Sequence, residues 1–258
     1  MTMMTTLEIE FLGTGTSTGV PMLRCKCPVC MSADPRDKRL RTSAIVRYQG
    51  ARLLIDCGPD FRTQMLRASD DNLDAVLLTH IHYDHVAGLD DLRSYCFEKP
   101  FPIYARADVL DNLHKRIPYC FSEHPYPGVP HFEEHAIVDD SAFLVEGVKV
   151  EPIPVMHYKM PILGFRIGPM AYITDAKTIA DNVVDRLKGI PLLVINSLRI
   201  GEHLSHMCLH ETLEVIDRVK PQRAYLIHMS DRMGLHADSV HMLPSNVELA
   251  YDGQIVKV

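Results

Sequence analysis

One stretch of seven residues, Thr79-His80-Ile81-His82-Tyr83-Asp84-His85, decides how this chain is interpreted. It contains three imidazoles and one carboxylate and directly follows the apolar run Ala75-Val76-Leu77-Leu78. Such a run predicts the end of a buried strand, so we expect the polar side chains on the turn where this strand leaves its sheet. Imidazole nitrogen suits zinc, and carboxylate oxygen suits harder cations such as manganese. The stretch therefore predicts a site for a first-row divalent metal; the alternative is a polar loop rich in histidine.

The order His-x-His-x-Asp-His after an apolar strand resembles the signature of the metallo-β-lactamase superfamily. The similarity extends from Phe11-Leu12-Gly13-Thr14-Gly15 almost to the C-terminus. It implies an α/β (α+β) fold, namely a four-layer αββα sandwich of two mixed β-sheets with helices on both outer faces. It also implies two metal ions at one edge and three later ligands, each of which follows a strand: His157, Asp175 and His228.

Carried onto this chain, the resemblance implies two sets of metal ligands. The first ion takes His80, His82 and His157, the second takes Asp84, His85 and His228, and Asp175 bridges both. Two divalent ions roughly 3.5–4 Å apart can activate a shared water, and a ligand set of this size leaves positions open for substrate, as a catalytic site requires. We expect two divalent ions, manganese or zinc; a purely structural metal cluster is the alternative. Asp56 is expected to orient the ligand loop through hydrogen bonds rather than to bind metal.

The composition limits the classes of protein that the chain can represent. Its 258 residues, 47% of them hydrophobic, are enough for one large core, and ligands from His80 to His228 must converge, so we expect a single hydrolase domain over residues 1–258. The net charge of −6 with scattered Lys and Arg argues against a nucleic-acid partner. No apolar run is long enough for a bilayer, and Met1 to Glu10 lacks a signal-peptide pattern, so no membrane association and a cytoplasmic location are expected.

Periodicity predicts several elements outside the metal loop. We expect a strand over residues 7–12, a hairpin of residues 44–48 and 52–56 around Gln49-Gly50, and helical spacing over residues 89–97 and 108–117. Two further helices are predicted over residues 178–187 and 209–219. The motif Tyr251-Asp252-Gly253-Gln254 predicts a tight turn between two last short strands.

A second motif, Cys25-Lys26-Cys27-Pro28-Val29-Cys30, predicts a structural zinc knuckle at residues 25–30. Three thiolates in six residues can surround one tetrahedral zinc ion, with a fourth ligand from elsewhere. The spacing resembles that of the phosphoribosyl 1,2-cyclic phosphate phosphodiesterases of the carbon–phosphorus lyase pathway, in which a histidine three residues after the last active-site histidine completes the site. Here that position is Asp231, so the fourth ligand is Asp231 or the nearby His236. The zinc would fix the N-terminal loop beside the segment that carries His228.

His206 gives the strongest indication of the reaction. It lies 22 residues before His228, where that phosphodiesterase branch and the tRNA 3′-processing nucleases place a histidine near the leaving oxygen. An imidazole with a pKa near neutrality can donate a proton there, and we count His206 and Asp84 as catalytic. We expect no role for His203 or His210, and assign a second substrate phosphate to Lys159 or Arg199.

The sequence therefore favours a metal-dependent phosphodiesterase acting on a small cyclic phosphodiester such as phosphoribosyl 1,2-cyclic phosphate, through attack of a metal-bridging hydroxide on phosphorus. The resemblance also implies a homodimer. A tRNA 3′-processing endonuclease is one alternative, but we find no basic Gly/Pro-rich arm of the kind those nucleases carry. A thioester or lactone hydrolase is another, although those branches lack the cysteine motif as families. A non-catalytic binding module is disfavoured because every ligand position is filled.

Overall fold

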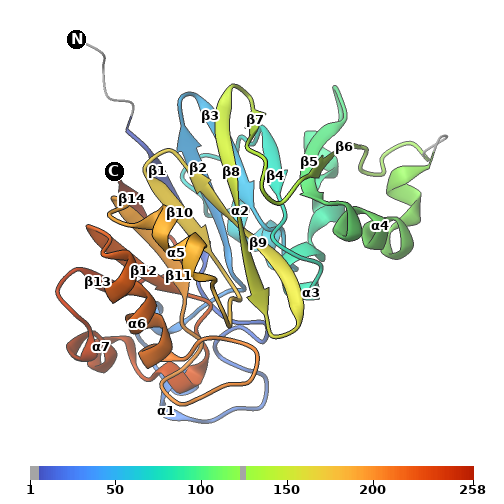
Figure 1. Ribbon diagram of the computed structural model, residues 1–258. Helices are drawn as coiled ribbons and strands as arrows, with labels where there is room; N and C mark the ends of the chain where they lie inside the picture. The colour runs from blue at the N-terminus through green and yellow to red at the C-terminus, as the bar shows by residue number, and fades with distance from the viewer. Residues whose placement is uncertain (1–5, 123–125) are drawn as a thin grey trace.

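Two seven-stranded β-sheets lie face to face in the computed structural model, which describes residues 6–122 and 126–258 (Figure 1). The first sheet has the strand order β14-β1-β2-β3-β4-β5-β6, and the second has the order β13-β12-β11-β10-β9-β8-β7. The strands of the first sheet are β1 (Glu8–Gly13), β2 (Ser43–Tyr48), β3 (Ala51–Ile55), β4 (Ala75–Leu77), β5 (Phe101–Arg106), β6 (Phe132–Ile137) and β14 (Ile255–Lys257). Those of the second are β7 (Phe143–Val145), β8 (Val148–His157), β9 (Met160–Ile167), β10 (Met170–Ile173), β11 (Leu192–Asn196), β12 (Arg223–Ile227) and β13 (Val247–Leu249).

Helices cover the outer faces of both sheets. The first sheet is covered by α2 (Phe61–Met65), α3 (Tyr83–Val86) and α4 (Ala107–Arg116), and the second by α5 (Asp181–Leu187) and α6 (Leu209–Val219). Two one-turn helices, α1 (Pro28–Met31) and α7 (His236–Ser239), lie close together at the bottom of Figure 1. The expected four-layer αββα sandwich is confirmed. No helix of the described residues has the length and apolar character that crossing a bilayer demands.

Three apolar layers hold the sandwich together. The inner faces of the two sheets pack against each other through side chains such as Phe11, Phe165 and Tyr172. Phe61 belongs to the layer beneath the helices of the first sheet, and Ile216 to the layer beneath those of the second. Burying a large apolar side chain of this kind stabilises the fold by about 1.5–3 kcal/mol, so these layers fix the orientation of both sheets.

Both sheets are mixed, and their parallel parts determine where functional side chains gather. Strands β3 to β6 run parallel in the first sheet, as do β10 to β13 in the second. Loops that leave the carboxyl ends of parallel strands meet at one edge, where ligands bind in open α/β sheets. At this edge the Leu163 amide of β9 donates a hydrogen bond to the Thr79 carbonyl, 3.1 Å away, just beyond β4. The two sheets are therefore joined where the histidine-rich loop begins.

The predicted elements agree with the structure in most places. The β2–β3 hairpin and the helix over residues 209–219 are confirmed, and residues 89–97 form a 3-10 helix over Leu89–Tyr95. The helix predicted from Thr178 begins only at Asp181, because the Thr178 carbonyl accepts a hydrogen bond from the Met156 amide of β8 at 3.0 Å. The turn at residues 251–254 joins strands that belong to different sheets.

Candidate metal centre

The sequence-predicted metal ligands all follow strands that end at the same edge. The histidine-rich loop runs from β4 into α3, His157 ends β8, and Asp175 and His228 stand just beyond β10 and β12. Asp56, Asp175 and His228 have φ angles of +60°, +57° and +57°, in the left-handed region that non-glycine residues seldom adopt. Such conformations cost energy and cluster at functional sites, where the surrounding packing maintains them.

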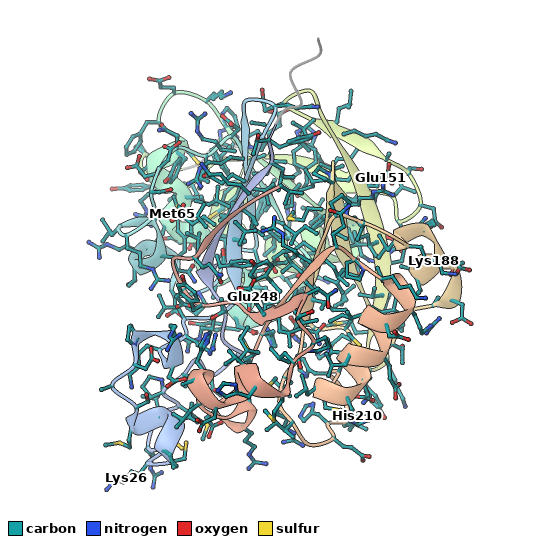
Figure 2. The ribbon with its side chains drawn as sticks, turned by 90° about the vertical axis from the view of Figure 1, so that its left-hand side faces the viewer. Lys26, Met65, Glu151, Lys188, His210 and Glu248 are labelled. Carbon is teal, nitrogen blue, oxygen red and sulfur yellow. The ribbon has the colours of Figure 1, made fainter. Side chains whose placement is uncertain are left out.

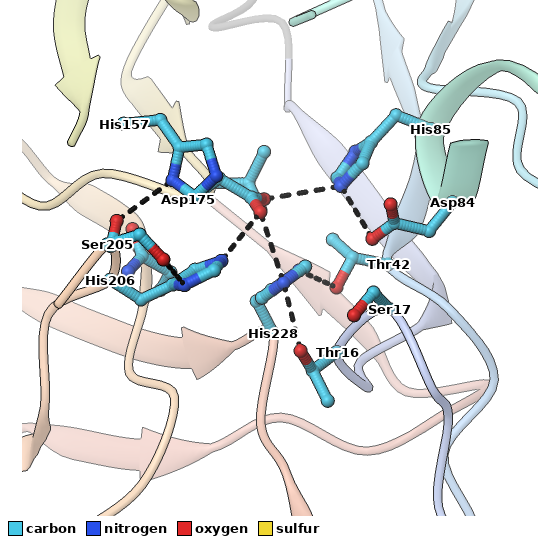
Figure 3. Close-up of polar contacts among 12 residues, drawn as sticks. Thr16, Ser17, Thr42, Asp84, His85, His157, Asp175, Ser205, His206 and His228 are labelled. Atoms are coloured by element: carbon cyan, nitrogen blue, oxygen red, sulfur yellow. Dashed lines mark hydrogen bonds and ion pairs between the residues drawn. The ribbon is translucent and has the colours of Figure 1, made fainter. Parts of the chain in front are cut away.

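The predicted ligands gather at this edge, and of the two predicted sets the second has its ligand atoms close enough together to hold one ion. The ring centroids of His80, His82 and His157 lie 4.7 to 5.8 Å apart. In the second set, Asp84, His85, Asp175 and His228 each offer one ligand atom, and these atoms lie within 4.8 Å of one another (Figure 3). Nε2 of His85 is 3.1 Å from the Asp84 carboxylate and 3.3 Å from that of Asp175.

Asp56 holds two imidazoles through hydrogen bonds, His85 directly and His80 through Thr79. Its carboxylate accepts hydrogen bonds from Nδ1 of His85 at 2.7 Å and from the hydroxyl of Thr79 at 2.8 Å. Because the single Thr79 proton is used in this way, its oxygen accepts from Nδ1 of His80 at 2.9 Å. Burial raises the pKa of Asp56, while the hydrogen bonds from His85 and Thr79 favour its ionised form. Asp56 therefore makes the hydrogen bonds to the ligand loop that the sequence predicts, and these bonds occupy Nδ1 of both rings.

Two other histidines carry their proton on Nδ1, as His80 does, and are held by different partners. Nδ1 of His157 donates to the Ser205 carbonyl at 2.8 Å, an oxygen that can only accept. The hydroxyl of Thr42 donates to the Gly15 carbonyl at 2.8 Å and therefore accepts from Nδ1 of His228, 3.2 Å away. Nε2 of His157 and Nε2 of His228 are thus also unprotonated, and the latter lies 3.1 Å from the Asp175 carboxylate.

These side chains fit a divalent metal centre. Nε2 of His80 and Nε2 of His85 are buried and have no hydrogen-bond partner among the described residues. A buried polar atom without a hydrogen-bond partner costs about 1–3 kcal/mol, so buried ring nitrogens of this kind indicate a cation site. Imidazole nitrogens combined with the two carboxylates of Asp84 and Asp175 suit zinc or manganese. His82 is exposed, which leaves the centre accessible from solvent.

Electrostatics at the centre agree with this donor set. Burial lowers the pKa of His80 well below its usual value and that of His228 to about 4, so both rings stay neutral. Burial opposes ionisation of Asp84, but the neighbouring His85 outweighs it and lowers the pKa of this carboxyl. Burial also opposes charge on His85, yet the carboxylates of Asp175, Asp56 and Asp84 raise its pKa well above the usual value, so a cation bound at Nε2 would displace a proton from this ring. The centre therefore concentrates negative charge that a cation can neutralise.

His206 differs from the proposed ligands in its tautomer. Its Nε2 lies 3.0 Å from Oδ1 of Asp175, and because a carboxylate only accepts, this nitrogen carries the proton. Its Nδ1 faces the Ser205 hydroxyl at 3.1 Å and Nδ1 of His203 at 3.3 Å. The imidazole thus presents an N–H group to the centre, as a proton donor does; one ligand atom from each of His157, Asp175 and His206 also lies within 4.8 Å of the others. His203, for which we expected no role, contacts this ring.

The three thiols of the cysteine motif converge on Asp231. One ligand atom from each of Cys25, Cys27, Cys30 and Asp231 lies within 4.8 Å of the others, and the Asp231 carboxylate is 3.6 Å from the first sulfur and 3.4 Å from the second. Burial and the neighbouring thiols raise the pKa of Cys30 to about 12, so this thiol keeps its proton when no cation is bound. A bound cation would displace that proton. His236 instead places Nδ1 3.3 Å from the Arg39 guanidinium, so the structure favours Asp231 as the fourth ligand. In Figure 2 this segment, where Lys26 is labelled, projects beside the C-terminal helices.

The two residues predicted to bind a second phosphate occupy different surroundings. Lys159 lies at the tip of the β8–β9 hairpin and lines a cavity together with His82 and His157. The Arg199 guanidinium donates to the carbonyls of Gly201 and Glu202 in its own loop. The sequence analysis did not identify Thr42 or Ser205, which orient His228 and His157. Of the hydroxyl residues that orient the histidines, only Thr79 could have been identified from the sequence, because it directly precedes His80.

Known proteins resemble this chain in sequence and fold. Residues 51–229 match the model of the beta-lactamase superfamily domain. The octanoyltransferase of Porphyromonas gingivalis is 46% identical over 94% of this chain, which spans only 50% of that protein. Ribonuclease Z of Mycobacterium sp. (strain KMS) is 29% identical over 75% of this chain and 69% of its own length. Among solved structures, a diphosphatase from the PhnP family matches 98% of this chain and 97% of its own with a TM-score of 0.91 and 35% identity.

Proposed function

This chain belongs to the metallo-β-lactamase superfamily of hydrolases, and on this premise we propose that it is a metal-dependent phosphodiesterase acting on small cyclic phosphodiesters. Phosphoribosyl 1,2-cyclic phosphate is the substrate that we favour. The observation that carries the proposal is the convergence of His85 and His228 on the Asp84 and Asp175 carboxylates, with a ligand atom of His157 also within 4.8 Å of one of Asp175.

We assign His80, His82 and His157 to one divalent ion, and Asp84, His85 and His228 to the other, with Asp175 shared. When bound, two such ions supply an activated water and neutralise charge on the phosphoryl oxygens. The protein's contribution is to hold Nδ1 of His80, His85, His157 and His228 in hydrogen bonds, so that Nε2 is the nitrogen available to a metal ion, which saves reorganisation when substrate arrives. Manganese and zinc both suit this mixture of nitrogen and oxygen ligands.

In our proposal, His206 donates the proton that the leaving oxygen requires. Its Nε2–H stands at the edge of the centre, 3.0 Å from Asp175, and the side chain is 13% exposed. The Ser205 hydroxyl and Nδ1 of His203 flank the opposite nitrogen, so that the ring plane is fixed from both sides. A departing alkoxide is a strong base, and a positioned imidazole proton accelerates its release by about two to four orders of magnitude.

Two kinds of relatives favour different chemistry. Both the PhnP-family diphosphatase and ribonuclease Z are named for reactions at phosphorus, and the first matches nearly the whole chain. The octanoyltransferase relative favours a second candidate, an acyl thioester hydrolase. Because this chain spans half of that protein, the name can belong to the other half, and the phosphodiesterase remains our choice.

We further propose that Cys25, Cys27, Cys30 and Asp231 bind one structural zinc ion. Asp231 stands three residues after His228, and the Met229 amide donates to the Thr14 carbonyl at 3.0 Å. Zinc bound here would therefore fix the N-terminal loop against the segment that presents His228.

The proposed function is tested with protein reconstituted with manganese or zinc. Bis-p-nitrophenyl phosphate and an S-octanoyl thioester are offered separately, and release of nitrophenol or thiol is followed. We expect turnover of the phosphodiester by the wild-type protein and loss of both turnover and bound metal in His80→Ala. The control His241→Ala, which replaces an exposed histidine distant from His80 in the sequence, should behave as wild type. Thioester turnover without phosphodiester turnover would replace our proposal with the second candidate.

A further inference from the structure

Glu211, in the first turn of α6, binds two segments of the chain at once. One oxygen of its carboxylate accepts a hydrogen bond from the Lys177 ammonium group at 2.6 Å. The other accepts from the Cys208 amide at 2.9 Å and from the Cys208 thiol at 3.0 Å. The side chains of Lys177 and Glu211 are 22% and 29% exposed, so solvent screens this ion pair less than a pair at the surface. We call these three residues the Glu211 clamp.

The clamp joins the segments that carry Asp175 and His206. Each of these residues lies two positions before the group that Glu211 binds. Between the two positions, the Met207 amide donates to the Ala176 carbonyl at 2.9 Å. These attachments stand beside the contact of 3.0 Å between Nε2 of His206 and Oδ1 of Asp175, which Figure 3 shows. The relative position of the proposed proton donor and the proposed shared ligand therefore depends on them.

The Lys177 end of the clamp is fixed to β8. The Lys177 amide donates to the Met156 carbonyl at 2.7 Å, and the Met156 amide donates to the Thr178 carbonyl at 3.0 Å. Met156 directly precedes His157, whose Nδ1 donates to the Ser205 carbonyl at 2.8 Å. Lys177 is thus a firm anchor, and the ion pair transmits its position to the start of α6.

The segment that presents His206 depends on such anchors. Residues 197–208 connect β11 to α6 and form no helix or strand. Cys208 and Glu211 form a capping box, which by itself explains the bond to the Cys208 amide. The contact with Lys177 has another cause, because a cation at the start of a helix opposes the helix dipole. This second contact ties the helix to the loop beyond β10, so we attribute it to positioning.

The Glu211 carboxylate stays ionised near neutral pH. Burial opposes its ionisation, but hydrogen bonds from Cys208 and Lys177 outweigh burial and lower its pKa to about 2. A charged acceptor strengthens the hydrogen bonds to both partners. Among the described residues, these hydrogen bonds go to Lys177 and Cys208 and to no proposed metal ligand. Any effect of Glu211 on the reaction therefore passes through the segments that it joins.

We infer that Glu211 is a positioning residue that holds the His206 imidazole against Asp175. It acts through Lys177 and Cys208. The inference rests on the proposed function, in which His206 donates a proton to the leaving oxygen. Loss of Glu211 should therefore slow reactions that need the His206 proton and spare those that do not, with metal content unchanged.

Two phosphodiesters distinguish this role from a purely structural one. Hydrolysis of adenosine 2′,3′-cyclic phosphate expels an alkoxide, a strong base that requires a proton, whereas bis-p-nitrophenyl phosphate expels a nitrophenolate, which leaves without one. In metal-loaded Glu211→Gln, the glutamine oxygen can keep the bond to the Cys208 amide, but its NH₂ group faces the Lys177 ammonium group. We expect kcat for the cyclic ester to fall about 10- to 100-fold and kcat for bis-p-nitrophenyl phosphate to stay within about threefold.

Three further variants make the comparison specific. Lys177→Met removes the cation without changing α6 and should show the same selective loss, which tests the link even where Glu211→Gln fails to fold. Glu214→Gln makes the same change at an exposed position of the same helix and should match wild type. Adding Glu211→Gln to His206→Ala should slow the cyclic ester by no more than about twofold, because both changes act through the same proton. Metal content and urea unfolding are measured for every variant.

The inference is overturned if Glu211→Gln or Lys177→Met, once folded, hydrolyses the cyclic ester at the wild-type rate, or if either slows both esters equally. A further loss on top of His206→Ala, or a loss of bound metal that accounts for the slower rate, would also overturn it. Wild-type protein that hydrolyses bis-p-nitrophenyl phosphate alone would do the same, because the His206 proton is then not used, and metal-dependent phosphodiester hydrolysis would stand. If wild-type protein hydrolyses neither ester, the proposed function fails as well.

Discussion

Replacing Asp56 by Asn tests whether hydrogen bonds behind the ligands control metal binding. The Asp56 carboxylate is fully buried and accepts from the Thr79 amide at 2.8 Å, the Thr79 hydroxyl at 2.8 Å and Nδ1 of His85 at 2.7 Å. An asparagine can keep the bond to the amide through its one oxygen, but its NH₂ group then faces two donors. His85 can relieve this conflict by giving up its Nδ1 proton and carrying one on Nε2, the nitrogen that must be free for metal.

The expected loss follows from this tautomer change. Altering a group that orients a metal ligand typically weakens metal affinity about 10- to 100-fold, which corresponds to about 1.4–2.7 kcal/mol. Chelator competition with zinc measures the affinity of Asp56→Asn directly. The ¹⁵N chemical shifts of His85 in the metal-free protein report which ring nitrogen carries the proton.

Asp252→Asn provides the matched control. This carboxylate is 4% exposed and accepts from the Thr14 amide at 2.9 Å, the Thr14 hydroxyl at 2.8 Å and the Leu40 amide at 2.7 Å, but touches no proposed ligand. Its replacement should destabilise the fold and leave metal affinity within about twofold of wild type. Wild-type affinity in Asp56→Asn, or an equal loss in Asp252→Asn, would refute the reasoning.

Three further predictions concern other parts of the molecule. His206→Ala should lower kcat by about two orders of magnitude or more and leave metal content intact, as measured by steady-state kinetics and elemental analysis; an unaltered rate would remove His206 from the reaction. Cys27→Ser should lose one zinc ion per chain and lower the melting temperature, whereas unchanged stoichiometry would dispose of the Cys25–Cys30 site. The pKa of His236 is lowered from 6.5 to about 4, chiefly by burial, so the unfolded chain takes up this proton before the folded protein as the pH falls. Metal-free protein should therefore lose up to about 3 kcal/mol of its free energy of unfolding between pH 6.5 and pH 4. His236→Gln should lose less over the same range, as measured by urea unfolding. An identical dependence on pH in both proteins would contradict this assignment.

The sequence predicts well those features that depend on neighbouring residues. The β2–β3 hairpin follows from Gln49-Gly50 between apolar strands, and α6 follows from its apolar spacing and from Pro221, which forbids continuation beyond Lys220. The histidine-rich loop is equally local, because four candidate ligands stand within six residues. Its place beyond a buried strand therefore follows from these residues and the apolar run that precedes them.

Features that depend on distant residues could not be predicted. Thr42 holds His228 across 186 positions, and neither residue signals the other. The start of α5 moves because Met156, on another strand, takes the Thr178 carbonyl. For the same reason, the turn near Gly253 could be identified, but nothing in it shows that β13 and β14 belong to different sheets. Long-range hydrogen bonding decides each of these features.

The origin of the ligands makes the proposed centre part of the fold itself. His80, His82, Asp84 and His85 follow a strand of the first sheet, whereas His157, Asp175 and His228 belong to the second. Without a cation, the fold brings the buried carboxylates of Asp84 and Asp175 close together and leaves two imidazole nitrogens without hydrogen-bond partners among the described residues, a cost that the apolar core must offset. A cation that binds both groups of ligands removes this cost and links the sheets at the edge where Leu163 and Thr79 already join them. The strained backbone conformations and the buried ring nitrogens without hydrogen-bond partners thus occur at the edge where we propose the chemistry to take place.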